Sequence, residues 1–168
     1  AVPILVTCSE KLARDVMKEL EKQASRLNRQ EIIKKSLSDQ CRLFVVESLD
    51  EAIKVANDIA PEHLELAVKE PQACAEQIRN AGAIFLGHYT PEAVGDYLAG
   101  PNHVLPTSGT ARFSSPLGVY DFVKRTSIMS YSPEALEKAA PLIRILAEME
   151  HLDAHANAVD LRIKKINK

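Results

Sequence analysis

Apolar residues in the first ninety positions alternate between short continuous runs and helical spacing. Continuous runs predict buried strands, and apolar residues three or four positions apart predict amphipathic helices. Strands are therefore expected at Val2–Thr7, Cys41–Glu47, Leu64–Val68 and Gly82–Leu86, and helices after Ser9 and at Glu31–Leu37, Leu49–Ile59 and Pro71–Asn80. Val2–Thr7 is apolar enough for burial on both faces. Alternating strands and helices favour an α/β fold with a mainly parallel, Rossmann-like sheet covered by helices.

A polar stretch, residues 95–118, interrupts this pattern. Loops longer than about 12–15 residues without secondary structure are uncommon in compact domains and are usually functional or disordered. Several apolar side chains in the stretch argue against a solvated linker, which would not need them. It also gathers side chains that coordinate, donate or transfer protons, namely Asp96, Asn102, His103, Thr107, Ser108 and Arg112. We interpret it as part of a site.

Beyond this loop the pattern is mainly helical. A short helix is expected at Leu117–Lys124 and a short strand at Ile128–Tyr131. Ser132-Pro133 is a typical helix start, and the helix should continue to about Leu152. The tail, Ala154–Lys168, has apolar residues at amphipathic spacing and a basic end. A long helix and a helical tail outside the α/β pattern indicate a separate arm.

These elements predict an α/β domain at residues 1–131 and a helical arm at residues 132–168, which packs on another subunit or on its own sheet. A formal charge of −2 gives no electrostatic reason to expect nucleic acid or a membrane surface. No apolar run approaches the roughly 20 residues of a membrane-spanning helix. Three widely separated cysteines favour a reducing, cytoplasmic setting over a disulfide framework.

Two groups of residues are candidates for proton transfer. Pro61 disfavours helix in the residue before it, so Glu62-His63 should lie where a helix gives way to a strand. A neutral imidazole is a natural proton acceptor, and an adjacent carboxylate can tune it or activate water. Asp96 and His103 open the polar loop at a spacing that fits no standard metal motif. Ordinary surface or loop roles remain the alternative for both groups.

A third candidate group lies near the end of the chain. His151 and His155 would share one face of a helix, with Glu150 nearby, and a solvated helix surface is the alternative. The chain contains no G-x-G-x-x-G or Walker loop, so no cofactor-binding residues are nominated. The residues alone thus indicate an α/β domain with a site at Glu62-His63 and the polar loop, with metal assistance left open.

Three segments of the chain resemble the histidinol dehydrogenase family. They are APEHLEL at residues 60–66, the stretch that begins GDYLAGPNHVLPTSG at Gly95, and HLDAHANAVDLRI at residues 151–163. The resemblance covers the whole chain but only the C-terminal portion of the enzyme. It implies an NAD-dependent, zinc-dependent oxidoreductase of histidine biosynthesis. Such an enzyme oxidises L-histidinol through L-histidinaldehyde to L-histidine.

The resemblance also implies roles for individual residues. Glu62 and His63 match the catalytic proton acceptors, His63 for the alcohol proton and Glu62 for the water that attacks the aldehyde. Asp96 and His155 match positions that bind zinc. Substrate contacts are implied for His63, Asp96, His103, Glu150 and His155. The other zinc ligands and the NAD-binding residues of the family lie upstream of this chain, so it is expected to be inactive alone.

The family is an intertwined homodimer whose C-terminal tail reaches the partner's active site. The helical arm would accordingly carry His155 to a second copy. Two other classes of protein stay open. A zinc-dependent hydrolase would need three protein ligands within this chain. A non-catalytic binding module is less consistent with the joint presence of Glu62, His63, Asp96 and His155.

Overall fold

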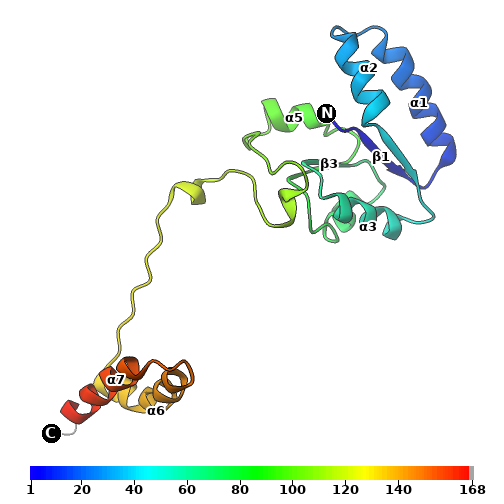
Figure 1. Cartoon of the computed structure of the whole chain (residues 1–168). Coiled ribbons are helices and arrows are strands. Elements are labelled where there is room, and N and C mark those ends of the chain that lie inside the picture. The colour runs from blue at the N-terminus through cyan, green and yellow to red at the C-terminus, as the bar shows by residue number, and fades with distance from the viewer. Residues whose placement is uncertain (167–168) are drawn as a thin grey trace. The chain divides into compact units, whose positions relative to one another are not determined.

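The computed structural model describes residues 1–166 and contains an α/β unit and a helical unit (Figure 1). The first compact unit is Ala1–Phe122, and the second begins at Val123. Residues 123–132 form neither helix nor strand, so the strand expected at Ile128–Tyr131 is wrong. A strand needs a hydrogen-bonded neighbour, and no strand among residues 1–166 pairs with this segment.

The first unit alternates strands and helices as its sequence predicts. Its elements are β1 (Ile4–Thr7), α1 (Glu10–Ala24), α2 (Gln30–Asp39), β2 (Arg42–Val45), α3 (Leu49–Ile59), β3 (His63–Leu66), α4 (Pro71–Ala75), β4 (Ala83–Leu86) and α5 (Glu92–Tyr97). Two 3₁₀ turns follow, at Thr110–Arg112 and Val119–Phe122. The second unit contains α6 (Pro133–Met149) and α7 (Asp153–Ile166). Among residues 1–166 no helix is both long and apolar enough to cross a membrane.

The strands of the first unit form two parallel pairs. β1 pairs with β2, from Ile4 opposite Arg42 to Thr7 opposite Val45. β3 pairs with β4, from His63 opposite Ala83 to Leu66 opposite Leu86. Helices connect the two strands of each pair, as a parallel crossover requires. The predicted α/β class is confirmed.

The first strand pair is less buried than its apolar sequence predicts. Helix α1 packs on both strands and beside α2 (Figure 1), yet Val2 is 60% and Val45 49% exposed. Neither β1 nor β2 has another strand beside it within residues 1–166. The expectation that Val2–Thr7 is buried on both faces is therefore wrong.

The core of the first unit lies at the second strand pair. Ile53 of α3, Leu66 of β3 and Cys74 of α4 are buried together, and burial raises the pKa of the Cys74 thiol. Partly buried side chains packed around them are Leu64, Val68, Ala75, Ile78 and Leu86. This core fixes β3 and hence the position of His63 at its first residue.

Helix α4 ends at Ala75, five residues before the predicted end at Asn80. The side chain of Asn57 on α3 explains the difference. Its Oδ1 accepts hydrogen bonds from the backbone N–H groups of Arg79 (2.6 Å) and Asn80 (3.2 Å), and its Nδ2 donates to the carbonyl of Gln77 (3.0 Å). These three bonds hold the backbone that leads into β4 against α3, so it does not continue the helix.

The polar stretch contains more regular structure than predicted. Its first residues belong to α5, and the helix expected at Leu117–Lys124 is only the 3₁₀ turn at Val119–Phe122. The loop between them is closed by Asn102. Its Nδ2 donates to the carbonyl of Leu117 (2.5 Å), and its Oδ1 accepts from the N–H of Val104 (2.8 Å). The loop is therefore an ordered structure held by its own side chains.

The second unit is a helical hairpin. Ser132 caps α6 as predicted, because its Oγ accepts a hydrogen bond from the N–H of Ala135 at 3.1 Å. The chain reverses at His151, whose φ of 59° is left-handed, and α7 follows. Three buried alanines, Ala140, Ala147 and Ala156, form the buried part of this unit. The last two residues of the predicted tail, 167–168, lie outside the described residues.

Candidate active site

The junction between α3 and β3 places the acid–imidazole pair. Helix α3 ends at Ile59, and Ala60 adopts a left-handed conformation with φ 50° although it is not glycine. That conformation costs about 1–2 kcal/mol, and burial of Ala60 to 1% exposure helps to hold it. The predicted helix end before Pro61 is confirmed. Glu62 is partly buried just before the strand, and His63 opens β3.

Three side chains gather beside the first residue of β3. The Nε2 atom of His63 lies 3.6 Å from Asp96 Oδ1 and 3.9 Å from Glu92 Oε1. Glu92 and Asp96 are four residues apart on α5, so both carboxylates face the same side of the helix. One ligand atom of each of the three residues lies within 4.8 Å of the others. We call these three residues the His63 cluster.

The imidazole nitrogen in this cluster has an unusual environment. Nε2 of His63 is covered, yet it has no hydrogen-bond partner among residues 1–166. A buried polar atom without a partner costs about 1–3 kcal/mol. A proton, a cation or a bound molecule between the nitrogen and the carboxylates would remove that cost. The cluster is thus suited to hold a positively charged or hydrogen-bonding group.

The two carboxyl groups of the His63 cluster influence each other. A side-chain hydrogen bond with Asp96 raises the pKa of Glu92 above its ordinary value. Desolvation and the negative charge of Asp96 raise this pKa further, and the imidazole of His63 opposes the change. Glu92 therefore keeps its proton to higher pH than an isolated glutamate would.

Close packing sets the distance between α5 and the strand pair. Phe85 of β4 is 5% exposed, and its ring centroid lies 5.9 Å from that of His63. A Cβ atom at Gly95 would lie only 2.5 Å from Cε1 of Phe85, so the helix can approach the ring only because residue 95 has no side chain. This contact brings Asp96, the next residue, close to His63.

The donor atoms of the His63 cluster fit a zinc ion. Zinc binds imidazole nitrogen and carboxylate oxygen, and catalytic zinc sites combine protein ligands with one open position. The cluster supplies both ligand types, including a covered imidazole nitrogen that lacks a partner within residues 1–166. The cluster could therefore hold a divalent cation, or its imidazole could act as a proton acceptor beside the two carboxylates.

The other nominated residues lie outside the His63 cluster. Glu62 precedes His63 but is not one of the three grouped residues. His103 is exposed in the loop that follows α5. In the second unit, Glu150 is exposed directly after α6, and His155 is exposed in the first turn of α7. The structure thus brings together two of the nominated residues, His63 and Asp96.

Sequence reasoning missed Glu92. The sequence pattern predicts a polar loop from Gly95 onward and no short helix at its start, whereas the structure has α5 there. Pro91 precedes the first residue of α5, and the i, i+4 spacing of Glu92 and Asp96 predicts a shared face once that helix is recognised. That spacing is the signal in the sequence that could have found Glu92.

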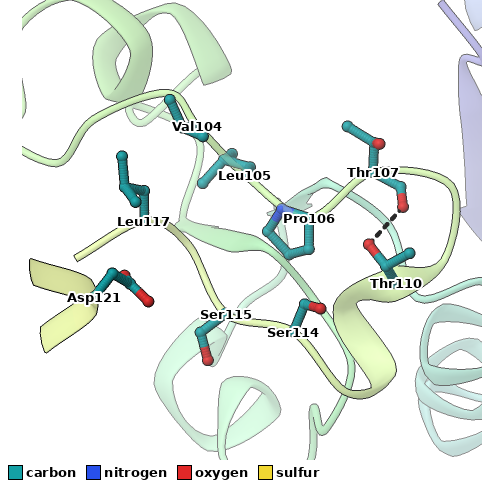
Figure 2. A pocket seen from close by; sticks show the side chains of 9 residues that line it. All are labelled: Val104, Leu105, Pro106, Thr107, Thr110, Ser114, Ser115, Leu117 and Asp121. Atoms are coloured by element: carbon teal, nitrogen blue, oxygen red, sulfur yellow. Dashed lines mark hydrogen bonds between the residues drawn. The ribbon is translucent and has the colours of Figure 1, made fainter.

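The polar loop forms a separate hollow of about 330 Å³. Figure 2 shows hydroxyl side chains around it beside Pro106, and the hydroxyl of Thr110 donates to the carbonyl of Thr107 at 2.7 Å. Ser114, Ser115 and Asp121 also line it. No residue of the His63 cluster does, so this hollow is not the site built on β3 and α5.

A parallel α/β unit with an imidazole and two carboxylates at a strand start defines a candidate metal-assisted acid–base enzyme site. Comparison with known proteins shows to which enzyme family the chain belongs. The sequence model of the family described as histidinol dehydrogenase matches residues 1–163. The chain belongs to the histidinol dehydrogenase family, and the resemblance seen in its sequence is confirmed.

Individual relatives agree with this assignment. The chain is 56% identical over 165 residues to the histidinol dehydrogenase of Heliobacterium mobile, a match that covers 98% of the chain and 39% of that relative. It is 55% identical over 162 residues to the enzyme of Caldanaerobacter subterraneus subsp. tengcongensis, which covers 96% of the chain and 38% of that relative. The crystal structure of histidinol dehydrogenase from Elizabethkingia anophelis superposes with a TM-score of 0.91 at 35% identity, covering 98% of this chain and 38% of that one. The chain thus spans less than half the length of these relatives.

Proposed function

We propose that this chain is the C-terminal portion of an NAD-linked, zinc-dependent histidinol dehydrogenase of cytoplasmic histidine biosynthesis. The enzyme would oxidise L-histidinol through L-histidinaldehyde to L-histidine. The observation that carries the proposal is the covered, unbonded Nε2 of His63, 3.6 Å from Asp96, in a chain of this family. Such an imidazole is ready to accept a proton beside a carboxylate that can hold a cation.

The acid–base steps follow from the two residues at the α3–β3 junction. His63 would accept the proton of the substrate hydroxyl, and NAD⁺, when bound, would supply the hydride acceptor for each of the two oxidations. Glu62, the residue before His63 in the chain, would then remove a proton from the water that adds to the aldehyde carbon.

Zinc would bind to Asp96 and to His155, the latter from a second copy of the chain. When bound, the metal would orient the substrate and polarise its reacting oxygen. His103 and Glu150 would contact the substrate, together with His63, Asp96 and His155. Because His155 is exposed on α7, it is accessible for such a role in a homodimer.

The first test uses a chimera because the chain spans only part of its relatives. This chain would replace the matching 39% of the Heliobacterium mobile enzyme, and NADH formation from L-histidinol, NAD⁺ and Zn²⁺ would be followed. We expect turnover by the chimera and none by the chain alone. In the chimera, His63→Gln should lower kcat by about 10²–10⁴-fold because the proton acceptor is lost.

His88→Gln is the matched control for that substitution. His88 follows β4, at the end of the strand pair opposite His63, and it has no role in the proposal. It should keep the kcat of the chimera. Robust turnover by the chain alone would overturn the expected inactivity, and an unchanged kcat in His63→Gln would overturn the catalytic role of His63.

The proposed homodimer has its own measurement. Size-exclusion chromatography with light scattering on the full chain should give the mass of a dimer if the helical arm associates with a second copy. A clean monomer at micromolar concentration would count against exchange of the arm.

A zinc-dependent hydrolase is the second candidate, and the His63 cluster favours it in one respect. The cluster contains the three protein ligands within one chain that a hydrolase requires. Isothermal titration with Zn²⁺ separates the two proposals. Negligible binding by the chain alone is expected for the dehydrogenase, whose zinc site is completed from elsewhere, whereas micromolar or tighter binding favours the hydrolase.

A further inference from the structure

A carboxylate on β3 holds the start of α5. Oε1 of Glu65 accepts a hydrogen bond from the backbone N–H of Glu92 at 2.9 Å. Glu92 is the first residue of α5, and Pro91, at the N-cap position, makes no side-chain capping bond. The first N–H groups of a helix have no partner within the helix. Glu65 therefore supplies from a neighbouring strand the acceptor that a capping residue would normally provide.

The position of Glu65 on β3 links this bond to the site. His63 and Glu65 are two residues apart on one strand, so their side chains point to the same face of the strand pair. Helix α5 begins at Glu92, beside Glu65, and brings Asp96 to 3.6 Å from His63 Nε2. Glu65 thus binds the first residue of α5, and His63, on the same face of β3, lies beside Asp96 near the end of that helix.

Helix α5 needs such anchors because it has only six residues. Isolated helices shorter than about 12–15 residues are marginal in water, so tertiary contacts must hold this one. Two contacts do so: the hydrogen bond from Glu92 to Glu65, and the close approach of Gly95 to Phe85. The second fixes the distance of the helix from the strands, and the first fixes where along β3 the helix begins.

We propose that Glu65 is a positioning residue that sets the register of α5 on β3 and thereby aims Asp96 and Glu92 at His63. Its catalytic consequence rests on the proposed dehydrogenase function, whereas its effect on α5 does not. Small displacements of catalytic groups are costly: a shift of about 1 Å can reduce a rate by about 10²-fold.

The geometric part is tested on the full chain by amide hydrogen exchange resolved at single residues. Glu65→Ala should accelerate exchange of the Glu92 amide by about tenfold or more, because its acceptor is removed. Glu65→Gln keeps an acceptor oxygen and should restore most of the protection. Wild-type exchange at the Glu92 amide in Glu65→Ala would overturn the proposal.

A second glutamate provides a matched control. Oε2 of Glu51 accepts the backbone N–H of Glu47 at 2.9 Å, in the first turn of α3 and at the opposite end of that helix from Pro61. Glu51→Ala removes the same kind of bond from an exposed carboxylate. It should accelerate exchange of the Glu47 amide and leave the Glu92 amide unchanged.

The catalytic part is tested in the chimera with the Heliobacterium mobile enzyme. Glu65→Ala should lower kcat by about 10- to 100-fold, Glu65→Gln should recover most of it, and Glu51→Ala should keep it. The Tm of the two alanine variants should fall to a similar extent, so that stability does not account for the difference in kcat. An unchanged kcat in Glu65→Ala, in an active chimera, would overturn the positioning role. An inactive wild-type chimera would count against the proposed function, and the exchange experiment would still decide the effect of Glu65 on α5.

Discussion

The two units present their candidate functional residues in opposite ways. In the first unit the side chain of His63 is only 27% exposed, its Nε2 is covered, and two carboxylates approach it. In the second unit Glu150 and His155 are exposed, and neither makes a side-chain hydrogen bond or ion pair within residues 1–166. In the first unit, neighbouring side chains surround the candidate catalytic imidazole. In the second unit, the candidate residues lie at the surface without such neighbours within residues 1–166.

The apolar side chains differ in the same way. The core of the first unit contains Ile53, Leu66 and Phe85, whereas the buried residues of the second unit, within residues 123–166, are all alanines. Large apolar residues on α6 are instead exposed at helical spacing: Leu142 (67%), Ile145 (53%), Leu146 (62%) and Met149 (72%). Contiguous exposed apolar residues mark interaction surfaces. This stripe supports the proposed homodimer, because a hairpin with a core of small residues has unburied apolar area to contribute.

The largest expected effect on stability is the difference between truncating a buried leucine of the first unit and an exposed leucine of the second. Leu66→Ala removes a buried side chain from the core of the first unit and should lower the free energy of unfolding by about 2–5 kcal/mol. Leu142→Ala on α6 should change it by less than about 0.5 kcal/mol at a concentration at which the chain is monomeric. Urea unfolding followed by circular dichroism measures both. Equal losses would contradict the contrast between the units.

A smaller effect is expected at the contact that seats α5. Gly95→Ala adds a methyl group 2.5 Å from Phe85 Cε1 and should destabilise the first unit by about 1–3 kcal/mol, although alanine is the better helix former. Gly118→Ala is the control, because its nearest neighbour would be Asp121 Oδ2 at 3.8 Å. Thermal unfolding reports the change. A gain in Tm for Gly95→Ala would show that the helix does not approach Phe85 this closely.

The smallest effect concerns the cap of the second unit. Ser132→Ala removes the hydrogen bond to the Ala135 N–H and should destabilise the start of α6 by about 1 kcal/mol. Exchange of the amides in the first turn of α6 measures it. Ser130→Ala, two residues earlier in the irregular segment, should leave those amides unchanged. If both variants behave alike, the start of α6 does not depend on this cap.

Local signals in the sequence predicted the parts of the fold that depend on local chemistry. Ser9 caps α1, with its Oγ accepting from the Leu12 N–H at 3.2 Å, and Ser132 caps α6. Such helix starts can be predicted from the sequence because the acceptor lies within three residues of the donor. The early end of α4 could not be predicted from local sequence. The side chain that causes it belongs to Asn57, which lies more than twenty residues away from Arg79 and Asn80.

The candidate site shows the same limit. The helix-to-strand junction at Glu62-His63 follows from Pro61, but nothing in the local pattern indicates that Asp96 lies beside His63. Asp96 was a candidate as a member of the polar loop, and the family resemblance assigned Asp96 and His63 to one substrate site. Glu92 escaped both approaches because α5 is short and is held by distant contacts with Glu65 and Phe85. Pairs that meet only through tertiary structure cannot be recognised from periodicity.

The three hydrogen bonds that the Asn57 side chain makes to residues 77–80 would be affected by deamidation of Asn57. Deamidation would convert the side chain to an aspartate, whose carboxylate could still accept from the N–H groups of Arg79 and Asn80. The same carboxylate would face the carbonyl oxygen of Gln77, to which the amide now donates at 3.0 Å, and two acceptors repel. A deamidated protein would therefore keep the hydrogen bonds from the N–H groups of Arg79 and Asn80 and lose the one to the carbonyl of Gln77. Deamidation of Asn57 would thus loosen the segment before β4.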